Sequence, residues 1–531
     1  MATLIDFELL QRLWRQEQEA SEARYRQEQT ERPFADRVEH GIAARKLSVV
    51  DIEVVVGRRL RLWLQSEESL EDLRIGRGQP VRLWRSDPTE EGAVPGVLAT
   101  RTRDKLAVVI DAEVPTEEGT TYQLDREAPR TTFERGLRAI ERWSEVLAGG
   151  AKGLELKGQP TTEGIGAVFA GTATPSFDGG RDGSFYDQGL NGLQRTAVTH
   201  CLSAREVALV HGPPGTGKTR TLVEVIRQEL AEQRRILVTA ASNAAVDNLA
   251  ERLIDAGVPL VRLGHPARVA TVVEDHTLDA QVERSEGFLL ARNWMREAAE
   301  LRRTVRKRRE RGRLDRAAAR SMQQEIRNLH RDARRTLDAA RDRILSKVGV
   351  VCTTATGAAM NDLSEVRFDL VVVDEATQAP DPLTLIALDR APRAVLAGDP
   401  KQLPPTVIDP DAARRGLART LFERIAEEFP ETLRLLEVQY RMNEAIMRFP
   451  SDSMYEGQLI AAEEVRDRTL ADLGAGPRAP WSFVDTAGLG WNDVRSDHDP
   501  SVRNPEQAER VVQEVERLFS VGVTPASLAL I

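Results

Sequence analysis

The chain has 531 residues, too many for one hydrophobic core, which predicts about three to four domains. Hydrophobic residues make up 41% of it and charged residues 30%, as in globular proteins, and no apolar run approaches the roughly 20 residues of a membrane span. The net charge of -9 argues against a uniformly basic surface. The N-terminus lacks the features of a signal peptide, so we expect a cytoplasmic protein with no membrane partner. Cys201 and Cys352 stand far apart and have no cluster of Cys or His near them, which excludes a disulfide framework or a zinc finger.

Residues 1–147 predict a helical stalk and a small β-barrel. Phe7, Leu10 and Trp14 share one face of a helical pattern over residues 5–29, whose other residues are mostly Glu, Gln and Arg. Short β-type runs separated by Gly, Pro and Asp come next, and the helical period returns over residues 132–147. The predicted strands are 48–56, 59–64, 80–84, 96–100 and 106–110.

Strands and helices alternate from residue 189 onward, after a stretch at 148–188 whose Gly, Thr and Ser content predicts a linker. Helical patterns cover residues 219–230 and 243–256. The alternation predicts an α/β domain with a parallel sheet, made of residues 189–264 and 348–432. Its predicted strands are 207–210, 235–240, 348–352, 370–373 and 394–397.

Residues 265–347 interrupt this domain with a helical composition broken at Gly312, which predicts a helical hairpin. Within it, residues 292–343 hold 18 Lys and Arg but only 8 Asp and Glu, so the positive charge is concentrated there. Such a surface can follow a phosphate backbone. If the acids pair with the arginines, it is only a solvated hairpin. Both interpretations stay open.

A second α/β unit begins at residue 433. Its expected elements are the stretches 437–442 and 481–485, a helix at 505–519 and a strand at 527–531. A domain of this kind needs roughly 100 to 150 residues. We therefore expect the unit over residues 433–531 to be truncated at its C-terminus.

A glycine-rich stretch, His-Gly-Pro-Pro-Gly-Thr-Gly-Lys-Thr, joins the first buried strand to its helix. Its glycines let backbone N–H groups converge on phosphate oxygens, and the helix N-terminus adds partial positive charge. The lysine is placed to reach the β- and γ-phosphates, and the last threonine to ligate Mg²⁺. The residues assigned to nucleotide or metal are Gly212, Pro213, Gly215, Thr216, Gly217, Lys218 and Thr219.

Acidic and amide side chains follow two later strands of the same sheet. Asp374 and Glu375 come after an apolar strand, and ligands of open α/β sheets bind beyond the carboxyl ends of strands. Asp374 is suited to hold Mg²⁺ through water and Glu375 to deprotonate an attacking water. Gln402 lies in Gly-Asp-Pro-Lys-Gln-Leu-Pro-Pro, where it is placed to contact that water or the γ-phosphate. A proline-stiffened turn is the alternative interpretation of this stretch.

Three further side chains are candidates for nucleotide contacts. Arg441, in Gln-Tyr-Arg-Met, is placed to neutralise charge on the γ-phosphate. Tyr440 is suited to stack on adenine, and Gln194 to read the adenine edge with its donor and acceptor. The alternatives are an arginine paired with a surface carboxylate and a tyrosine in the core.

Small polar residues follow the remaining strands and suit hydrogen bonds to a sugar-phosphate backbone. Capping of the following helices is the alternative for each of them. These candidates are Ser242, Asn243, Thr353, Thr354 and Thr356.

In this order the motifs resemble those of the superfamily 1 helicases. Within that superfamily the chain resembles the group of the nonsense-mediated-decay helicase and the immunoglobulin mu-binding helicase. Stretches 262–268 and 483–488 are similar to that group as well. The motifs are Gln194 and the stretches 212–219, 241–247, 374–378, 398–405 and 439–442.

The resemblance implies two RecA-like P-loop domains that close on ATP and Mg²⁺, with single-stranded DNA or RNA running across them and translocation from 5' to 3'. It also implies a β-barrel on a helical stalk and a helical insertion that gates the nucleic acid. Lys218, Thr219, Asp374, Glu375, Gln402 and Arg441 match the family's ATPase positions. Gln194 and Tyr440 match its adenine contacts, and Ser242, Asn243 and Thr354 its contacts to the strand.

Two departures temper this expectation. Ala241 stands where the family has Pro, and the last motifs, which include a second arginine facing the γ-phosphate, do not occur before Ile531. We therefore expect a monomeric fragment that binds nucleotide and hydrolyses it poorly. A nucleotide-dependent switch or scaffold that never unwinds, and a helicase with a nuclease further along, are the alternatives. The motifs suit DNA and RNA equally, because backbone and stacking contacts serve both.

Overall fold

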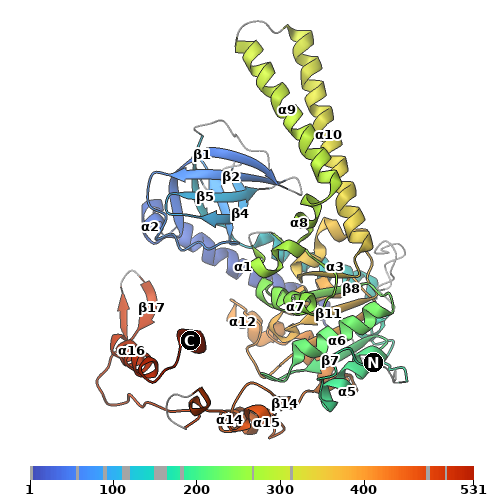
Figure 1. Cartoon of the computed structure of the whole chain (residues 1–531), viewed down its shortest axis with the longest axis vertical. Coiled ribbons are helices and arrows are strands. Elements are labelled where there is room, and N and C mark those ends of the chain that lie inside the picture. The colour runs from blue at the N-terminus through green and yellow to red at the C-terminus, as the bar shows by residue number, and fades with distance from the viewer. Residues whose placement is uncertain are drawn as a thin grey trace. The chain divides into compact units, whose positions relative to one another are not determined.

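A closed barrel of six antiparallel strands occupies the N-terminal part of the chain (Figure 1). The computed structural model describes residues 4–30, 32–55, 59–87, 93–110, 120–148, 164–179, 184–265, 268–310, 315–473, 479–496 and 499–531. The barrel confirms the five predicted strands and adds a sixth, β6. In spatial order its strands are β1 (Ala43–Val55), β2 (Arg59–Ser66), β5 (Lys105–Ile110), β4 (Val94–Arg101), β3 (Pro80–Trp84) and β6 (Thr121–Arg126).

The barrel has an apolar core of its own. Alternate residues of β2 point inward, so that Leu62 and Leu64 are buried while their neighbours are partly exposed. Tyr122 and Leu124 on β6 complete the same cluster. The alternation of these two with polar residues is the pattern of a half-buried strand, but the run is only six residues long.

Helices on either side of the barrel in sequence, α1 (Phe7–Thr30) and α3 (Arg130–Leu147), pack against each other. The rings of Trp14 and Phe133 lie 4.8 Å apart. A Cβ at Gly136 would lie 2.5 Å from the Trp14 Nε1 atom, so the close approach of the two helices requires glycine there. Apolar residues of both helices belong to one core with the large sheet. The short α2 (Phe34–Glu39) precedes β1.

The large sheet has seven strands. All the neighbouring pairs from β7 to β9 are parallel, which confirms the predicted α/β class. Every residue of β7, β8 and β11 is buried, as in parallel sheets covered on both faces. The order is β13 (Leu433–Leu435), β7 (Val207–His211), β12 (Arg393–Gly398), β11 (Leu370–Asp374), β8 (Ile236–Ala240), β10 (Val350–Thr354) and β9 (Leu260–Arg262).

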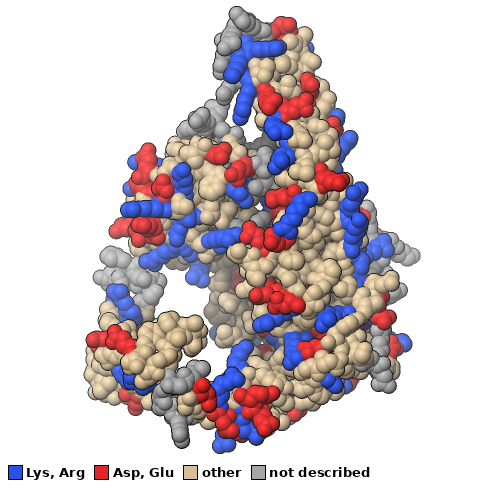
Figure 2. Space-filling model, in the orientation of Figure 1, with Lys and Arg blue, Asp and Glu red and all other residues tan. Residues whose placement is uncertain are grey.

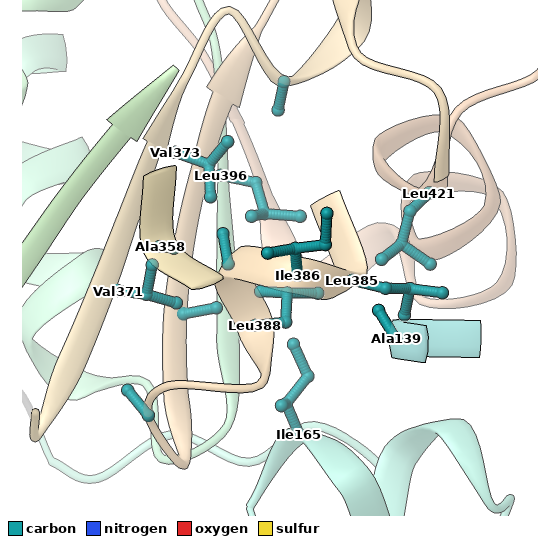
Figure 3. Packing of buried hydrophobic residues seen from close by; sticks show 14 of the residues in the cluster. Ala139, Ile165, Ala358, Val371, Val373, Leu385, Ile386, Leu388, Leu396 and Leu421 are labelled. Carbon is teal, nitrogen blue, oxygen red and sulfur yellow. The ribbon is translucent and has the colours of Figure 1, made fainter. Parts of the chain in front are cut away.

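Helices accompany this sheet and share its core. Figure 3 shows Ile386 and Leu388 of α11 close to Val371 of β11, with Ile165 of α4 pointing toward them. The predicted linker is therefore wrong in part, because Ile165, Val168 and Phe169 are buried in the core. Residues 149–163 and 180–183 of that linker lie outside the described residues. The helices are α4 (Ile165–Phe169), α5 (Gly192–Ser203), α6 (Lys218–Ala231), α7 (Asn243–Asp255), α11 (Asp381–Leu388), α12 (Pro410–Ala412) and α13 (Leu421–Glu428).

The predicted helical hairpin is confirmed by α9 (Glu286–Glu310) and α10 (Arg316–Lys347), which pack along each other after the short α8 (Leu278–Glu283) (Figure 1). The predicted break at Gly312 lies outside the described residues. Near the base of the hairpin, Arg341 pairs with Asp362, and Arg59 of the barrel pairs with Asp279 of α8 at 3.0 Å. Polar contacts thus connect the barrel to this part of the chain.

Residues 435–531, together with the loop 212–218, form a second unit, and residues 1–211 and 219–434 form the larger one. The predicted helix at 505–519 is confirmed, but the strand at 527–531 is wrong, and 481–485 forms no strand. A strand needs a neighbouring strand to satisfy its backbone N–H and C=O groups. The described strands of this unit form two separate two-stranded sheets, and neither offers such a neighbour to residues 527–531. Its elements are β14 (Val438–Gln439), α14 (Glu444–Met454), β15 (Ile460–Ala461), α15 (Glu463–Arg466), β16 (Val494–Ser496), β17 (Asp499–Arg503) and α16 (Pro505–Ser520). Among the described helices, none combines the length and apolarity of a membrane span.

Candidate nucleotide and nucleic-acid site

The carboxyl ends of the parallel strands meet at one edge of the sheet. Gly398 at the end of β12 lies opposite His211 at the end of β7. On the other side, both Asp374 of β11 and Thr354 of β10 lie opposite Ala240 of β8. This strand-end edge, formed by the residues that end or follow β7, β12, β11, β8 and β10, therefore carries most of the predicted site residues.

The glycine-rich loop 212–218 has the backbone of a phosphate cradle. Gly215 and Gly217 have φ angles of 81° and 82°, a region that side chains with a Cβ rarely adopt. A Cβ at Gly212 would lie 2.7 Å from the Lys218 Cβ atom, so the lysine stem passes directly over this glycine. The Thr216 hydroxyl donates to the Pro213 carbonyl oxygen at 2.7 Å and closes the turn. These residues fit the triphosphate that the motif predicts.

Lys218 and Thr219 begin α6 directly after this loop. Lys218 is 9% exposed, and Thr219 is half-buried. The helix N-terminus adds the partial positive charge expected beside phosphate oxygens. The local structure therefore matches the predicted strand, loop and helix.

Asp374 and Glu375 stand at the tip of β11. Asp374 is 5% exposed, and its Oδ1 atom accepts the backbone N–H of Glu375 at 2.9 Å. Glu375 has φ 52° and ψ 39°, a left-handed conformation that is strained for a residue with a Cβ and recurs at functional sites. Its Oε2 atom accepts the Gln378 amide at 3.0 Å.

A magnesium ion at this edge would draw on few protein ligands. Within the described residues, no three His, Cys, Asp or Glu side chains gather as a metal site. Mg²⁺ is commonly held by one or two protein oxygens, waters and the phosphates of its nucleotide. The hydroxyl of Thr219 and the carboxylate of Asp374 are donors of that kind, so the residues present fit the ion.

Asp399, which directly follows β12, connects three of the strand-end loops. It is 1% exposed, and its Oδ1 atom lies 3.0 Å from the His211 Nε2 atom. Its backbone N–H donates to the Thr377 hydroxyl at 3.0 Å. Its Oδ2 atom accepts the Gln402 Nε2 amide at 2.7 Å. The exposed side chain of Gln402 is thereby held next to the end of β7.

Within the second unit, the loop 212–218 contacts the residues that follow β14. The Tyr440 N–H donates to the Gly215 carbonyl oxygen at 2.8 Å, and a Cβ at Gly215 would lie 2.5 Å from the Arg441 Cβ atom. The buried side chain of Gln439 accepts the N–H groups of Arg441 and Met442 at 2.8 and 2.7 Å. Arg441 is exposed, and within the described residues its guanidinium has no carboxylate partner. The predicted nucleotide residues of this motif thus lie against the phosphate loop.

Gln194 has a capping role in the structure. Its Oε1 atom accepts the Asn191 N–H at 3.0 Å, and the Asn191 side chain accepts the Gln194 N–H at 2.8 Å, which forms a capping box for α5. The residue is 1% exposed. If Gln194 contacts adenine, its amide group does so while its Oε1 atom also caps α5.

The residues predicted to contact a nucleic-acid strand differ in their surroundings. The Ser242 hydroxyl caps α7 by accepting the Ala245 N–H at 3.2 Å. Asn243 uses its Oδ1 atom to accept Arg262 at 3.0 Å. Thr354 accepts the Gly357 N–H at 3.1 Å and remains partly exposed. Thr353 is fully buried beneath Gly357, so its hydroxyl cannot reach a strand in this structure.

The loop after β10 is also held by α3. Arg135 donates to the Thr356 carbonyl oxygen at 2.8 Å. Burial lowers the pKa of the Arg135 guanidinium from its ordinary value, with a smaller effect from Arg138. A helix next to the barrel in sequence therefore reaches one of the strand-end loops.

Comparison with known proteins places this site in a family. Two models, each described as an AAA domain, match residues 189–410 and 417–531. An ATP-dependent helicase of Methanocaldococcus jannaschii is 31% identical over 496 residues, which cover 85% of this chain and 71% of the relative. The chain belongs to the superfamily 1 helicases. Its group is the one that includes SMUBP-2 and the regulator of nonsense transcripts 1.

Longer relatives of this helicase group match equally broadly. DNA-binding protein SMUBP-2 of Rattus norvegicus is 33% identical over 502 residues, which cover 90% of this chain and 49% of the rat protein. A regulator of nonsense transcripts 1 homolog of Neurospora crassa is 30% identical over 92% of this chain and 41% of the relative. The chain thus spans about half the length of these relatives. A solved arterivirus helicase overlaps 82% of this chain and 62% of its own at 12% identity and a TM-score of 0.30, too low to support an argument.

Two functional connections of this helicase were missed in the sequence. Asp399 lies in the stretch that carries Gln402, but the sequence does not show it as the common partner of His211, Thr377 and Gln402. Arg262 is fully buried. Its guanidinium donates to the Asp247 carboxylate at 2.6 Å and to the Asn243 side chain at 3.0 Å. An arginine at the end of an apolar strand was the available signal, since a buried guanidinium requires acceptors.

Proposed function

We propose that this protein is a nucleic-acid-stimulated ATPase that moves 5' to 3' along single-stranded DNA or RNA and separates strands. The observation that carries this proposal is the strand-end edge, where a glycine-shaped phosphate loop follows β7 and the acidic pair 374–375 follows β11 of the same parallel sheet. Family membership supports the same reaction class. The activity of the whole relatives extends to this chain as part of the proposal.

Binding of ATP falls to the loop and the helix that follows it. The backbone N–H groups of 212–218 and the Lys218 ammonium bind the phosphates. Tyr440 stacks on adenine, and the Gln194 amide contacts its edge. Thr219 and Asp374 hold Mg²⁺, which when bound neutralises phosphate charge. Each of these roles needs the side chain to meet the nucleotide.

Hydrolysis needs a positioned water and a charge partner for the γ-phosphate. Glu375 accepts the proton of the attacking water. Gln402, fixed by Asp399, contacts that water or the γ-phosphate. Arg441 neutralises the charge that builds on the transferring phosphate, in agreement with a guanidinium that no described carboxylate neutralises.

A single strand is bound through its backbone. Asn243 and Thr354 contact the sugar-phosphate chain from the strand-end edge, with Ser242 mainly fixing the start of α7. We further propose that 189–264 with 348–432 and 433–531 act as two RecA-like domains, with α1 and α3 as the stalk of the barrel. The hairpin adds exposed arginines, which Figure 2 shows interspersed with acidic side chains on the face in view. We propose that this hairpin gates the strand.

ATP turnover with poly-dT or poly-U as stimulant tests this proposal on the full chain. We expect stimulation by single strands, dependence on Mg²⁺, and a loss of at least about 10²-fold in Lys218→Ala. Glu428→Gln, an exposed acid on α13, is the matched control. Turnover without strand separation in an unwinding assay favours a nucleotide-dependent switch. Absence of both nucleotide binding and turnover rejects the proposal.

A further inference from the structure

Glu17 of α1 binds two consecutive backbone amides far away in the sequence. Its Oε1 atom accepts the Ile408 N–H and its Oε2 atom accepts the Asp409 N–H, each at 2.8 Å. Glu17 is 5% exposed although it is an acid on a helix rich in polar residues. A carboxylate that accepts two N–H groups in a shielded place forms strong, charge-assisted hydrogen bonds. The contact is therefore a specific tether.

The tethered backbone is the segment that carries Gln402. At one end of residues 402–409, Asp399 holds the Gln402 amide, and at the other end Glu17 holds residues 408 and 409. Pro404 and Pro405 lie between them and fix two of the backbone φ angles. The segment is thus held at both ends and stiffened at its two prolines. The position of Gln402 thus depends on both anchors.

The same end of the segment is reinforced by a neighbouring side chain. The Gln16 amide donates to the Asp409 Oδ1 atom at 2.8 Å. That oxygen also accepts the Ala412 N–H at 2.7 Å and caps α12. α1 itself is held against α3 by Trp14 and Phe133. Glu17 therefore fixes the segment to a rigid support.

We propose that Glu17 is a positioning residue for ATP hydrolysis, which sets the Gln402 segment from the helix that leads into the barrel. This inference rests on the proposed function of Gln402. Because Glu17 touches neither the phosphate loop nor the acidic pair, its loss changes turnover more than nucleotide affinity. The displaced group is the one that contacts the water or the γ-phosphate, and small misplacements of such groups are costly.

Steady-state turnover on the full chain, with poly-dT, tests the role. We expect kcat to fall about 10-fold in Glu17→Ala and less in Glu17→Gln, which keeps one acceptor oxygen of the two, while KM for ATP changes by less than about 2-fold. Glu19→Ala is the matched control, since this acid is exposed on the same helix. If Glu17→Ala does not fold, the isosteric Glu17→Gln decides the outcome.

A double variant distinguishes positioning from general support of the fold. If Glu17 acts through Gln402, adding Glu17→Ala to Gln402→Ala lowers kcat by less than about 2-fold further. Independent effects that multiply overturn the proposal, and so does wild-type kcat in both Glu17 variants. A wild-type chain without stimulated turnover instead rejects the proposed function itself. Amide exchange provides a check without activity, because the Ile408 and Asp409 amides become less protected in Glu17→Ala and not in Glu19→Ala.

Discussion

The two β structures of the larger unit are built on opposite plans. The barrel is antiparallel and closed, and its core consists of its own inward-facing residues. The seven-stranded sheet is parallel in all its pairs from β7 to β9, and its core is shared with α1, α3 and α4. The candidate residues of the sheet, among them Asp374 and Asp399, lie at its strand-end edge. We therefore place the proposed chemistry in the sheet, which α1, α3 and polar contacts such as Arg59–Asp279 connect to the barrel.

This difference divides residues 1–147 in a way that the sequence did not indicate. Leu13, Trp14, Phe133 and Trp143 belong to the core of the sheet, although they come from helices next to the barrel. Arg37, by contrast, forms a buried two-pronged ion pair with Asp125 inside the barrel region, at 3.0 and 3.1 Å. We therefore expect α1 and α3 to unfold together with the sheet and not with the barrel.

The largest expected effect on turnover comes from replacing the proposed base at the strand-end edge, a change that leaves both hydrophobic cores intact. Glu375→Gln keeps the shape of the side chain but removes the proposed base. We expect kcat to fall about 10³-fold with little change in ATP affinity. Stimulated turnover and nucleotide binding measure the two quantities. Unfolding curves that match the wild type would confirm that no core is affected, whereas near-normal kcat would refute the role.

Much of the sheet could be predicted from the sequence because its strands are continuous apolar runs that end in polar residues. The apolar runs that end near His211 and Asp374 are the strands β7 and β11, as predicted. What could not be predicted depends on partners distant in sequence. Tyr122 and Leu124 form a strand only because β1 and β3 pair with it. Likewise, Glu17 looks like one more acid of a polar helix until the segment at 408–409 folds against it.

A core variant in α3 tests whether the helices belong to the sheet. Trp143 is buried, stacks edge-on against Phe169 at 5.2 Å, and donates to the Leu385 carbonyl oxygen at 3.2 Å. We expect Trp143→Ala to lower the free energy of unfolding of the sheet by about 4 kcal/mol, from lost burial and a cavity. Urea denaturation monitored by amide exchange in β7 and β11 measures it. Unchanged protection there, with loss confined to the barrel, would reverse the assignment.

The matching variant in the barrel should act locally. Leu62→Ala removes a fully buried side chain from the barrel core, with an expected loss of about 3 kcal/mol in barrel stability. Amide protection should fall in β1 to β6 and hold in β7 and β12, and turnover without nucleic acid should persist. An equal loss of protection in the sheet would show that the two cores unfold as one.

A smaller effect is expected where polar groups connect the two structures. Burial, together with Arg59, Arg268, Arg61 and Arg77, lowers the pKa of His265 to about 3. The folded protein thus keeps this imidazole neutral, while the unfolded chain protonates it near pH 6.5.

The stabilising contribution of His265 is present above pH 6.5 and is lost as the pH falls toward 3, by at most about 1.4 kcal/mol per pH unit. We expect about 2 kcal/mol between pH 6.5 and 5, seen as a lower free energy of unfolding in urea. His265→Gln should flatten this dependence. Parallel curves for the variant and the wild type would show that other groups cause it.

The first and last strands of the barrel lie side by side, with Ala43 opposite Asp125. The polypeptide therefore enters and leaves the barrel at nearly the same point, and the two ends of the inserted segment are close together. A short bridge between residues 42 and 127 should suffice to excise it, or to graft a foreign module in its place, without pulling α1 away from α3.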